Sequence, residues 1–215
     1  MDLLQNLNEL IFPSRCIGCG ELGLSLCSLC RKSWHPHYYL RNIGKDSKEL
    51  TVISSVIYSA VAQKIILGAK ESHIRQCDYL VAEALTHALQ RFLTRTTIDF
   101  LIPVPSQKSA IRQRGREFLV EISEQVSSSC DIPVVNILSH NRRVKDQSGL
   151  DLQERWNNVE GAFVVEREHG IHGNILLIDD LVTTGATLCE AARALRYAGI
   201  KVIGAVTAAL AQPLR

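Results

Sequence analysis

The sequence predicts an α/β protein built on a parallel sheet, with a small cysteine-bearing segment at its N-terminal end. Short, almost entirely apolar stretches alternate with longer amphipathic ones, as they do in βαβ domains. The most apolar stretch, 174–180, ends in two aspartates and is followed by a turn rich in threonine and glycine. Continuous apolar strands of this kind are typical of a parallel sheet that helices cover on both faces.

The composition is that of a globular protein. The 215 residues are enough for one α/β domain and a small appendage, with 46% hydrophobic and 21% charged residues. Because the net charge is only +2, bulk charge does not hold a polyanion, and any nucleic-acid binding depends on local basic clusters. No apolar run approaches the roughly 18 residues of a transmembrane helix, so we expect no membrane insertion.

The N-terminal residues 1–12 differ from a signal peptide in two respects. Acidic and amide residues interrupt the apolar run, and no basic segment precedes it. The apolar residues instead fall on one face of a predicted short helix, namely Leu3, Leu4, Leu7, Leu10 and Ile11. We therefore expect a cytoplasmic protein, in which disulfides are not favoured.

Three zones follow one another along the chain. We expect an N-terminal helix and cysteine segment at 1–40, a polar connection at 41–49, and the α/β domain at 51–215. Strands are predicted where runs of β-branched and apolar residues stand between polar turns, and Pro103 and Pro105 end one of them. The predicted strands are 51–58, 98–105, 132–138, 161–165, 174–180 and 200–206.

Helices are predicted where apolar residues recur at helical spacing, at 78–95, 116–129 and 186–198. Gly199 is the expected C-terminal stop of the last helix. The polar stretch 139–158 shows no periodicity, and a loop of that length inside a compact domain is usually functional or mobile.

The cysteines at the N-terminal end form two C-x-x-C pairs, Cys16 with Cys19 and Cys27 with Cys30. Two such pairs bring four thiolates around one ion in a closed tetrahedral Zn²⁺ site. A redox pair or chance burial of thiols is the alternative, but neither accounts for two pairs within fifteen residues. We predict structural zinc; the nearby His35 and His37 are either spare ligands or, more simply, surface histidines.

The segment 175–188 has the features of an anion-binding site. Asp179 and Asp180 follow a buried strand at its carboxyl end, where ligands of open α/β sheets bind. The turn that comes next leads into a helix, so its backbone N–H groups and the helix dipole favour a phosphate. This turn consists of Thr183, Thr184, Gly185, Ala186 and Thr187. The alternative is a strand-end acid pair beside an ordinary threonine N-cap, but the full pattern favours a phosphate beside ribose hydroxyls or hydrated Mg²⁺.

The same segment resembles the phosphoribosyl-pyrophosphate fingerprint of type I phosphoribosyltransferases. The resemblance implies their fold and names the ligand, phosphoribosyl pyrophosphate with Mg²⁺. It also implies that Asp179 and Asp180 contact the ribose hydroxyls as catalytic residues, and that residues 183–187 hold the 5′-phosphate. Hypoxanthine-guanine enzymes carry a catalytic aspartate where this chain has Thr183, although orotate enzymes also lack it.

Over nearly its whole length the chain resembles the ComF family, phosphoribosyltransferase-like proteins linked to DNA uptake in natural competence. The matching parts are the cysteine pairs, Tyr58, Lys70, 102–115, 142–163 and the fingerprint. Two departures stand out. Arg116, Glu117 and Phe118 follow Gly115 where family members commonly continue F-N-Q. Asp146 replaces a usual threonine, and an acid in a basic loop weakens its hold on anions.

By analogy with the fold, residues 103–108 form a loop beside the pyrophosphate, and 139–158 form a hood loop that closes over the ligand. The basic or polar residues expected at this rim, facing pyrophosphate or nucleic acid, are Ser106, Lys108, Arg112, Arg114, Arg116, Arg142, Arg143 and Lys145. The alternate arginines at 112, 114 and 116 do not share one helical face, so we expect a loop or helix start there. For each cation the alternative is a solvated charge.

Two functions follow from these observations. The first is a DNA-handling factor whose basic rim holds single-stranded DNA, with Trp34, Tyr38 and Tyr39 as stacking platforms or, alternatively, as packing for the cysteine pairs. Competence helicase-type proteins are then expected partners. The second is an active transferase in which a nitrogen nucleophile displaces pyrophosphate. Only nine residues follow the predicted strand 200–206, so we expect no C-terminal hood, and base selection falls to the N-terminal zone and the region around Tyr58. This favours the first function.

Overall fold

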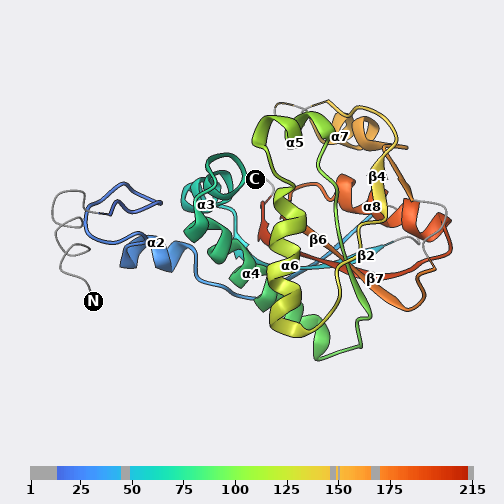
Figure 1. Cartoon of the computed structure of the whole chain (residues 1–215), viewed down its shortest axis with the longest axis horizontal. Coiled ribbons are helices and arrows are strands. Elements are labelled where there is room, and N and C mark those ends of the chain that lie inside the picture. Colours follow the sequence, from blue (N-terminus) through green and yellow to red (C-terminus); the bar gives the residue numbers. More distant parts are fainter. Residues whose placement is uncertain (1–13, 45–48, 146–148, 150, 166–169, 213–215) are drawn as a thin grey trace.

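The computed structural model describes residues 14–44, 49–145, 149, 151–165 and 170–212. The helix predicted at 1–12 and the departure at Asp146 lie outside these residues. The body is an α/β layer structure, and the cysteine-bearing segment with helix α2 extends from one side of it (Figure 1). Among the described helices, none is long and apolar enough to cross a membrane.

The main sheet has five strands in the order β1-β2-β7-β6-β3. Neighbouring pairs from β2 to β3 are parallel, whereas β1 is antiparallel to β2. A second sheet is a small antiparallel ribbon of β4 and β5. The strands are β1 Tyr39–Ile43, β2 Leu50–Ile57, β3 Phe100–Pro103, β4 Leu138–His140, β5 Phe163–Val165, β6 Asn174–Val182 and β7 Lys201–Leu210. The predicted parallel sheet is confirmed, and an antiparallel edge strand is added to it.

The helices are α2 Ser28–Ser33, α3 Ala60–Ser72, α4 Arg75–Leu93, α5 Lys108–Arg114, α6 Phe118–Cys130, α7 Leu152–Val159 and α8 Ala186–Tyr197. The connection through α4 runs from β2 toward β3, and the one through α8 runs from β6 back to β7. Right-handed crossovers in opposite directions place α4 and α8 on opposite faces of the sheet. Between the two layers, Ile175 to Ile178 of β6 are fully buried, as the apolar run predicts.

The structure corrects the prediction at two places in the sheet. Residues 41–43, expected in a polar connection, belong to β1, whose alternating burial is that of an edge strand. The strand predicted at 132–138 is reduced to one bridge, Val134 with Leu101, followed by the short β4. Pro133 lacks an N–H group, so a longer ladder is not available there.

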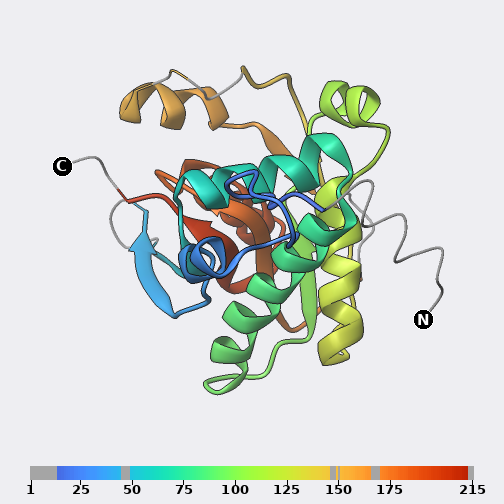
Figure 2. The same ribbon diagram turned by 90° about the vertical axis from the view of Figure 1, so that its left-hand side faces the viewer.

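The segment 139–158 is not the unpatterned loop that we expect from its sequence. Helix α7 occupies its last part, and it begins with a capping box in which Asp151 and Glu154 each bind the other's backbone N–H. Helix α5 likewise holds Arg112 and Arg114, where a loop or helix start is predicted, and Gly115 ends it with φ +71°. Both short helices lie at the same end of the molecule, at the top of Figures 1 and 2.

Candidate functional site

A cavity of about 830 Å³ opens among α3, α5, α6, the β4–β5 ribbon and the end of β6. The charged side chains in its lining are Lys70, Arg114, Arg143, Lys145, Arg155, Asp179 and Asp180. Cations therefore outnumber acids, and such a wall suits a ligand with several negative charges. No lining residue precedes Tyr58 among the residues described, and base selection by the N-terminal zone stays a prediction.

The threonine-glycine turn, residues 183–187, joins β6 to α8 beside this cavity. Thr183 and Thr187 line the cavity, and a smaller hollow of about 20 Å³ lies within the turn itself. Gly185 has φ +84°, a left-handed conformation that favours glycine. Helix α8 begins at the next residue, so its first free N–H groups belong to this turn. Backbone donors and threonine hydroxyls are thus together, as predicted.

Asp179 and Asp180, the acid pair, lie on the last part of β6, and their surroundings differ. Lys70 donates to Asp180 Oδ2 at 2.8 Å. Burial works against ionisation of Asp180, but the Lys70 ammonium outweighs it and lowers the pKa of Asp180. Burial and the neighbouring charge of Asp180 raise the pKa of Asp179 well above its usual range. One carboxylate is therefore paired and ionised, while its neighbour takes up a proton more readily.

Tyr58 and Lys70, which the sequence resemblance singles out, both converge on the acid pair. Tyr58 directly follows β2 and lines the cavity. Burial first, and then the charge of Asp180, raise the pKa of Tyr58, while Lys70 acts against them. Despite the cost of burial, the charge of Asp180 raises the pKa of Lys70. The charge of Asp180 on β6 therefore acts both on Tyr58, which follows β2, and on Lys70 of α3.

The predicted rim residues fall into two groups. Ser106, Arg114, Arg143 and Lys145 line the cavity, and Arg114 also pairs with Glu71 at 2.7 Å. The remaining predicted rim residues within the described ranges, Lys108, Arg112, Arg116 and Arg142, do not line it. Lys108 and Arg112 are exposed on α5.

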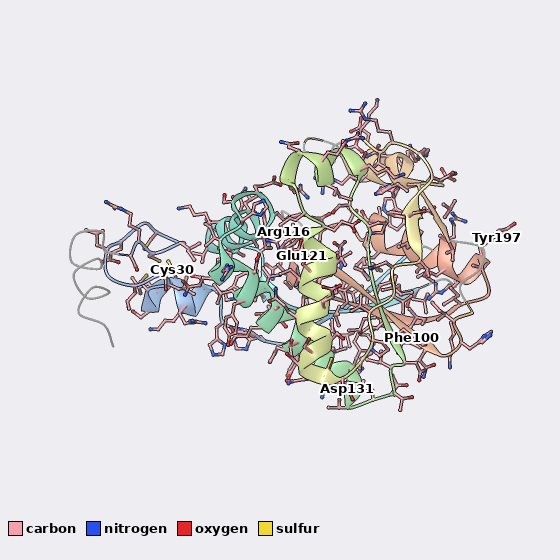
Figure 3. All side chains as sticks on the ribbon, in the orientation of Figure 1. Cys30, Phe100, Arg116, Glu121, Asp131 and Tyr197 are labelled. Atoms are coloured by element: carbon pink, nitrogen blue, oxygen red, sulfur yellow. The ribbon has the colours of Figure 1, made fainter. Side chains whose placement is uncertain are left out.

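Arg142 and Arg116 have partners within the protein. Arg142 donates to the carbonyl oxygens of Asn158 and Glu160 at the end of α7. The Arg116 side chain is buried between Asp78 and Glu121, 2.9 Å from each carboxylate, with its guanidinium 5.6 Å from the ring centre of Phe118. Figure 3 shows Arg116 and Glu121 side by side at the upper end of α6. The expectation that Arg116 belongs to the rim was wrong.

Two amide side chains hold the backbone next to Arg143 and Lys145. The Gln107 side chain donates to the Val144 carbonyl at 2.7 Å and accepts from the Val144 N–H at 3.3 Å. The Asn158 side chain makes the same reciprocal pair with the Lys145 backbone, at 2.9 and 3.0 Å. Sequence reasoning missed this clamp, because Gln107 and Asn158 are far from each other along the chain. The clamp keeps two cations at the mouth of the cavity.

The four cysteines meet as predicted, in a separate place from the cavity. Their sulfur atoms all lie within 4.8 Å of one another, against about 3.8 Å between ligands in a tetrahedral Zn²⁺–thiolate site. The Cys27 N–H points to Cys16 Sγ at 3.3 Å. Burial works against ionisation of the Cys16 thiol. Hydrogen bonds from the backbone of Cys27, Cys19 and Gly18 and from the Cys19 side chain nevertheless lower its pKa to about 6. Four sulfur donors and a ready thiolate fit a structural zinc ion, which would close the site.

The aromatic and histidine residues beyond the cysteines take different positions. Trp34 is fully buried, so it is not a platform for bases. Tyr39 belongs to β1 and packs against the core. Tyr38 is exposed and stacks on His87, with ring centres 4.1 Å apart. His35 and His37 are exposed and lie outside the group of four sulfur atoms.

Comparisons with known proteins agree with this description. Residues 109–213 match the family model of the phosphoribosyl transferase domain. Competence protein F of Haemophilus influenzae is 33% identical over 218 residues, covering 89% of this chain and 95% of the relative.

Two solved structures show a more distant likeness. An adenine phosphoribosyltransferase gives a TM-score of 0.46 at 12% identity, over 85% of this chain and 89% of its own. The adenine phosphoribosyltransferase of Saccharomyces cerevisiae, complexed with an imino-altritol bisphosphate and adenine, gives 0.44 at 10% identity, over 85% and 88%.

Proposed function

Because the chain belongs to the ComF family, we propose that it binds phosphoribosyl pyrophosphate in the cavity and acts in DNA uptake during natural transformation. Its fold is that of type I phosphoribosyltransferases, with a four-cysteine cluster at the N-terminal end. The observation that carries the proposal is the meeting of three features in one cavity: the acid pair, the threonine-glycine turn and a cationic wall.

The chemistry of these groups supports one orientation of the ligand. The 5′-phosphate takes the N–H groups and hydroxyls of the turn, as anions do at helix N-termini. The ribose hydroxyls face Asp179 and Asp180, and the pyrophosphate faces Arg114, Arg143 and Lys145. A bound Mg²⁺ is normally held by one or two carboxylates together with phosphate oxygens, and the acid pair supplies such carboxylates. When bound, the metal would neutralise charge on the leaving pyrophosphate.

Calorimetric titration with phosphoribosyl pyrophosphate and Mg²⁺ tests the proposal. We expect saturable binding by the natural protein and none by the variant Asp179→Asn with Asp180→Asn. Glu124→Gln removes an exposed acid on α6 and is the matched control, for which the affinity should not change. Circular dichroism checks that each variant is folded. Unaltered affinity in the double variant would contradict the ribose site.

For the biological role we propose that the protein handles single-stranded DNA in the cytoplasm, together with competence helicase-type proteins. The name of the Haemophilus influenzae relative supports a role in competence. Lys108 and Arg112 support DNA binding, because both are exposed on α5 next to the cavity. Fluorescence anisotropy with a labelled single strand should show affinity that falls steeply with salt. Replacing both residues with alanine should reduce the log–log slope by about 0.7 for each DNA phosphate that the protein no longer neutralises. A flat salt dependence contradicts this role.

Transferase activity is a second candidate, and the apolar part of the cavity lining favours it. The lining includes apolar and aromatic side chains that suit a flat nucleophile: Tyr58, Ile66, Leu67, Phe118, Leu119 and Phe163. A nitrogen atom would attack the anomeric carbon, and pyrophosphate would leave from the opposite side. Incubation with the ligand, Mg²⁺ and a panel of bases should then release pyrophosphate. Tight binding without release for every base supports a binding role alone.

A further inference from the structure

Strand β1 lies directly against the threonine-glycine turn, although 140 residues or more separate them in sequence. Arg41 Nη1 donates to the Thr183 carbonyl at 3.0 Å. Ile43 packs against Gly185 so closely that a Cβ atom on residue 185 would come 2.4 Å from Ile43 Cδ1. Neither residue lines the cavity among the described contacts. Whatever they contribute to the site therefore acts through the turn.

The geometry of the strand brings both contacts to the turn. Residues 41 and 43 are two apart, so their side chains project from the same face of β1. Antiparallel pairing fixes their positions, with Arg41 opposite Val52 and Ile43 opposite Leu50 of β2. Arg41 has no carboxylate within ion-pair distance in the described parts of the chain. A half-buried guanidinium without an acid partner thus sits beside a turn suited to an anion.

The hydrogen bond to Thr183 has a consequence for the donor groups of the turn. The Thr183 carbonyl and the Thr184 N–H belong to one planar trans peptide unit, in which they point in opposite directions. When Arg41 holds the carbonyl on the side of β1, the Thr184 N–H is directed to the other side. Ile43 acts on the next residue, because its side chain fills the space that any residue except glycine would need at 185.

We propose that Arg41 and Ile43 are positioning residues of the threonine-glycine turn, and that they set its donors for the 5′-phosphate of the ligand. The inference rests on the proposed function and extends it to the N-terminal part of the chain. Arg41 orients the Thr183–Thr184 peptide, and Ile43 packs against Gly185 in the space that a side chain would otherwise need. The positive charge of Arg41 also adds to the potential at the turn.

Titrations with ribose 5-phosphate, with inorganic pyrophosphate and with phosphoribosyl pyrophosphate plus Mg²⁺ test this inference. Arg41→Met should weaken binding of ribose 5-phosphate and phosphoribosyl pyrophosphate by about 10- to 100-fold, the effect of one charge-assisted hydrogen bond. Its affinity for pyrophosphate, which does not use the turn, should change less than about twofold. Arg41→Lys keeps a charged donor and should recover most of the loss. Arg95→Met removes an exposed arginine elsewhere and is the control.

The possible outcomes separate the two proposals. If the natural protein binds none of the three ligands, the proposed function itself fails. If it binds them and Arg41→Met retains full affinity for ribose 5-phosphate, the positioning role is wrong. Equal losses for ribose 5-phosphate and pyrophosphate would indicate general damage to the fold and would also overturn it. Should Arg41→Met not fold, Ile43→Val gives the same comparison with a smaller change.

Discussion

The cysteine cluster and the cavity are two sites built in opposite ways. The cluster takes all its donors from one stretch of fifteen residues and brings them together with local turns and α2. The cavity takes its lining from residues between Tyr58 and Thr187, carried by several helices and strands. The first is small and uniform in chemistry, whereas the second is open and mixes cations, acids and apolar groups. Spacing along the chain therefore describes the cluster completely and the cavity only in part.

The largest effect is expected at the cluster. Cys30→Ser removes one of four thiolates, and structural zinc in comparable sites contributes about 10–16 kcal/mol of apparent binding free energy. We expect metal analysis to fall from about one zinc per chain to none, and the melting transition to broaden or move down. Cys130→Ser, a cysteine outside the cluster, is the control and should keep its zinc. A full complement of zinc in Cys30→Ser would contradict a site held by all four cysteines.

The next effect concerns Arg116, which is part of the structural framework near the cavity and not of its rim. Arg116→Met leaves the buried Asp78 without its cation, and breaking a buried ion pair costs about 3–5 kcal/mol. Urea denaturation should show this loss, while the affinity for phosphoribosyl pyrophosphate stays the same. Arg112→Met removes an exposed charge and should change stability by less than about 0.5 kcal/mol. Equal stability of the two variants would contradict the assignment.

The two residues of the acid pair should make stability depend on pH in opposite directions. Because the pKa of Asp180 is lowered in the folded protein, its contribution is present above about pH 4 and is lost as the pH falls through the folded pKa. Asp180→Asn should therefore destabilise the protein at pH 7, by about 1–3 kcal/mol for a partly buried pair. Chemical denaturation from pH 3 to pH 8 measures this contribution.

Asp179 should behave in the opposite way. Its pKa is raised, so the folded protein holds a proton that the unfolded chain releases above about pH 4, and stability falls as the pH rises from there. Asp179→Asn removes this penalty and should be more stable than the natural protein at pH 8, with the gap closing toward pH 4. If both variants lose stability at pH 8, the division of roles within the pair is wrong.

The smallest effect is expected at the amide clamp. Asn158→Leu removes two hydrogen bonds to the Lys145 backbone, each with a net value of about 1 kcal/mol. Stopped-flow experiments should show phosphoribosyl pyrophosphate leaving several-fold faster, and the melting temperature should fall by about 4–8 °C. Asn157→Leu is the matched control, since Asn157 is exposed and bonds only Gln153 among its described contacts. Identical dissociation rates for the two variants would argue against the clamp.

The contrast between features set by neighbouring residues and features set by distant ones also explains which elements the sequence predicts correctly. Buried strands and long amphipathic helices carry strong periodic signals, so β2, β6, β7, α4 and α8 were placed correctly. Strand β1 was missed because an edge strand with Arg41 and Asn42 looks like a polar connection. The strand predicted at 132–138 was wrong because an apolar run around Pro133 packs without forming a ladder.

For the candidate site, the turn at 183–187 is contiguous, so its residues stand out in the sequence. The partner of Asp180 does not, because Lys70 comes from a helix 110 positions away. The burial of Arg116 depends on Asp78 in α4 as well as on Glu121 in α6, and spacing along the chain carries no signal of the contact with α4. The hydrogen bond of Arg41 to Thr183 was out of reach for the same reason.

The clamp of Gln107 and Asn158 also has a consequence for how often the stretch around Val144 leaves the cavity lining. The backbone at 144 and 145 is held by side chains and not by a neighbouring strand, so it can detach while the main sheet stays folded. Four hydrogen bonds at about 1 kcal/mol each, with about 2 kcal/mol for exposing Val144, give an opening free energy of about 6 kcal/mol. Roughly one empty molecule in twenty-five thousand is then open at any instant. Each opening would take Arg143 and Lys145 out of the cavity lining, so its frequency bears on how fast a bound ligand leaves.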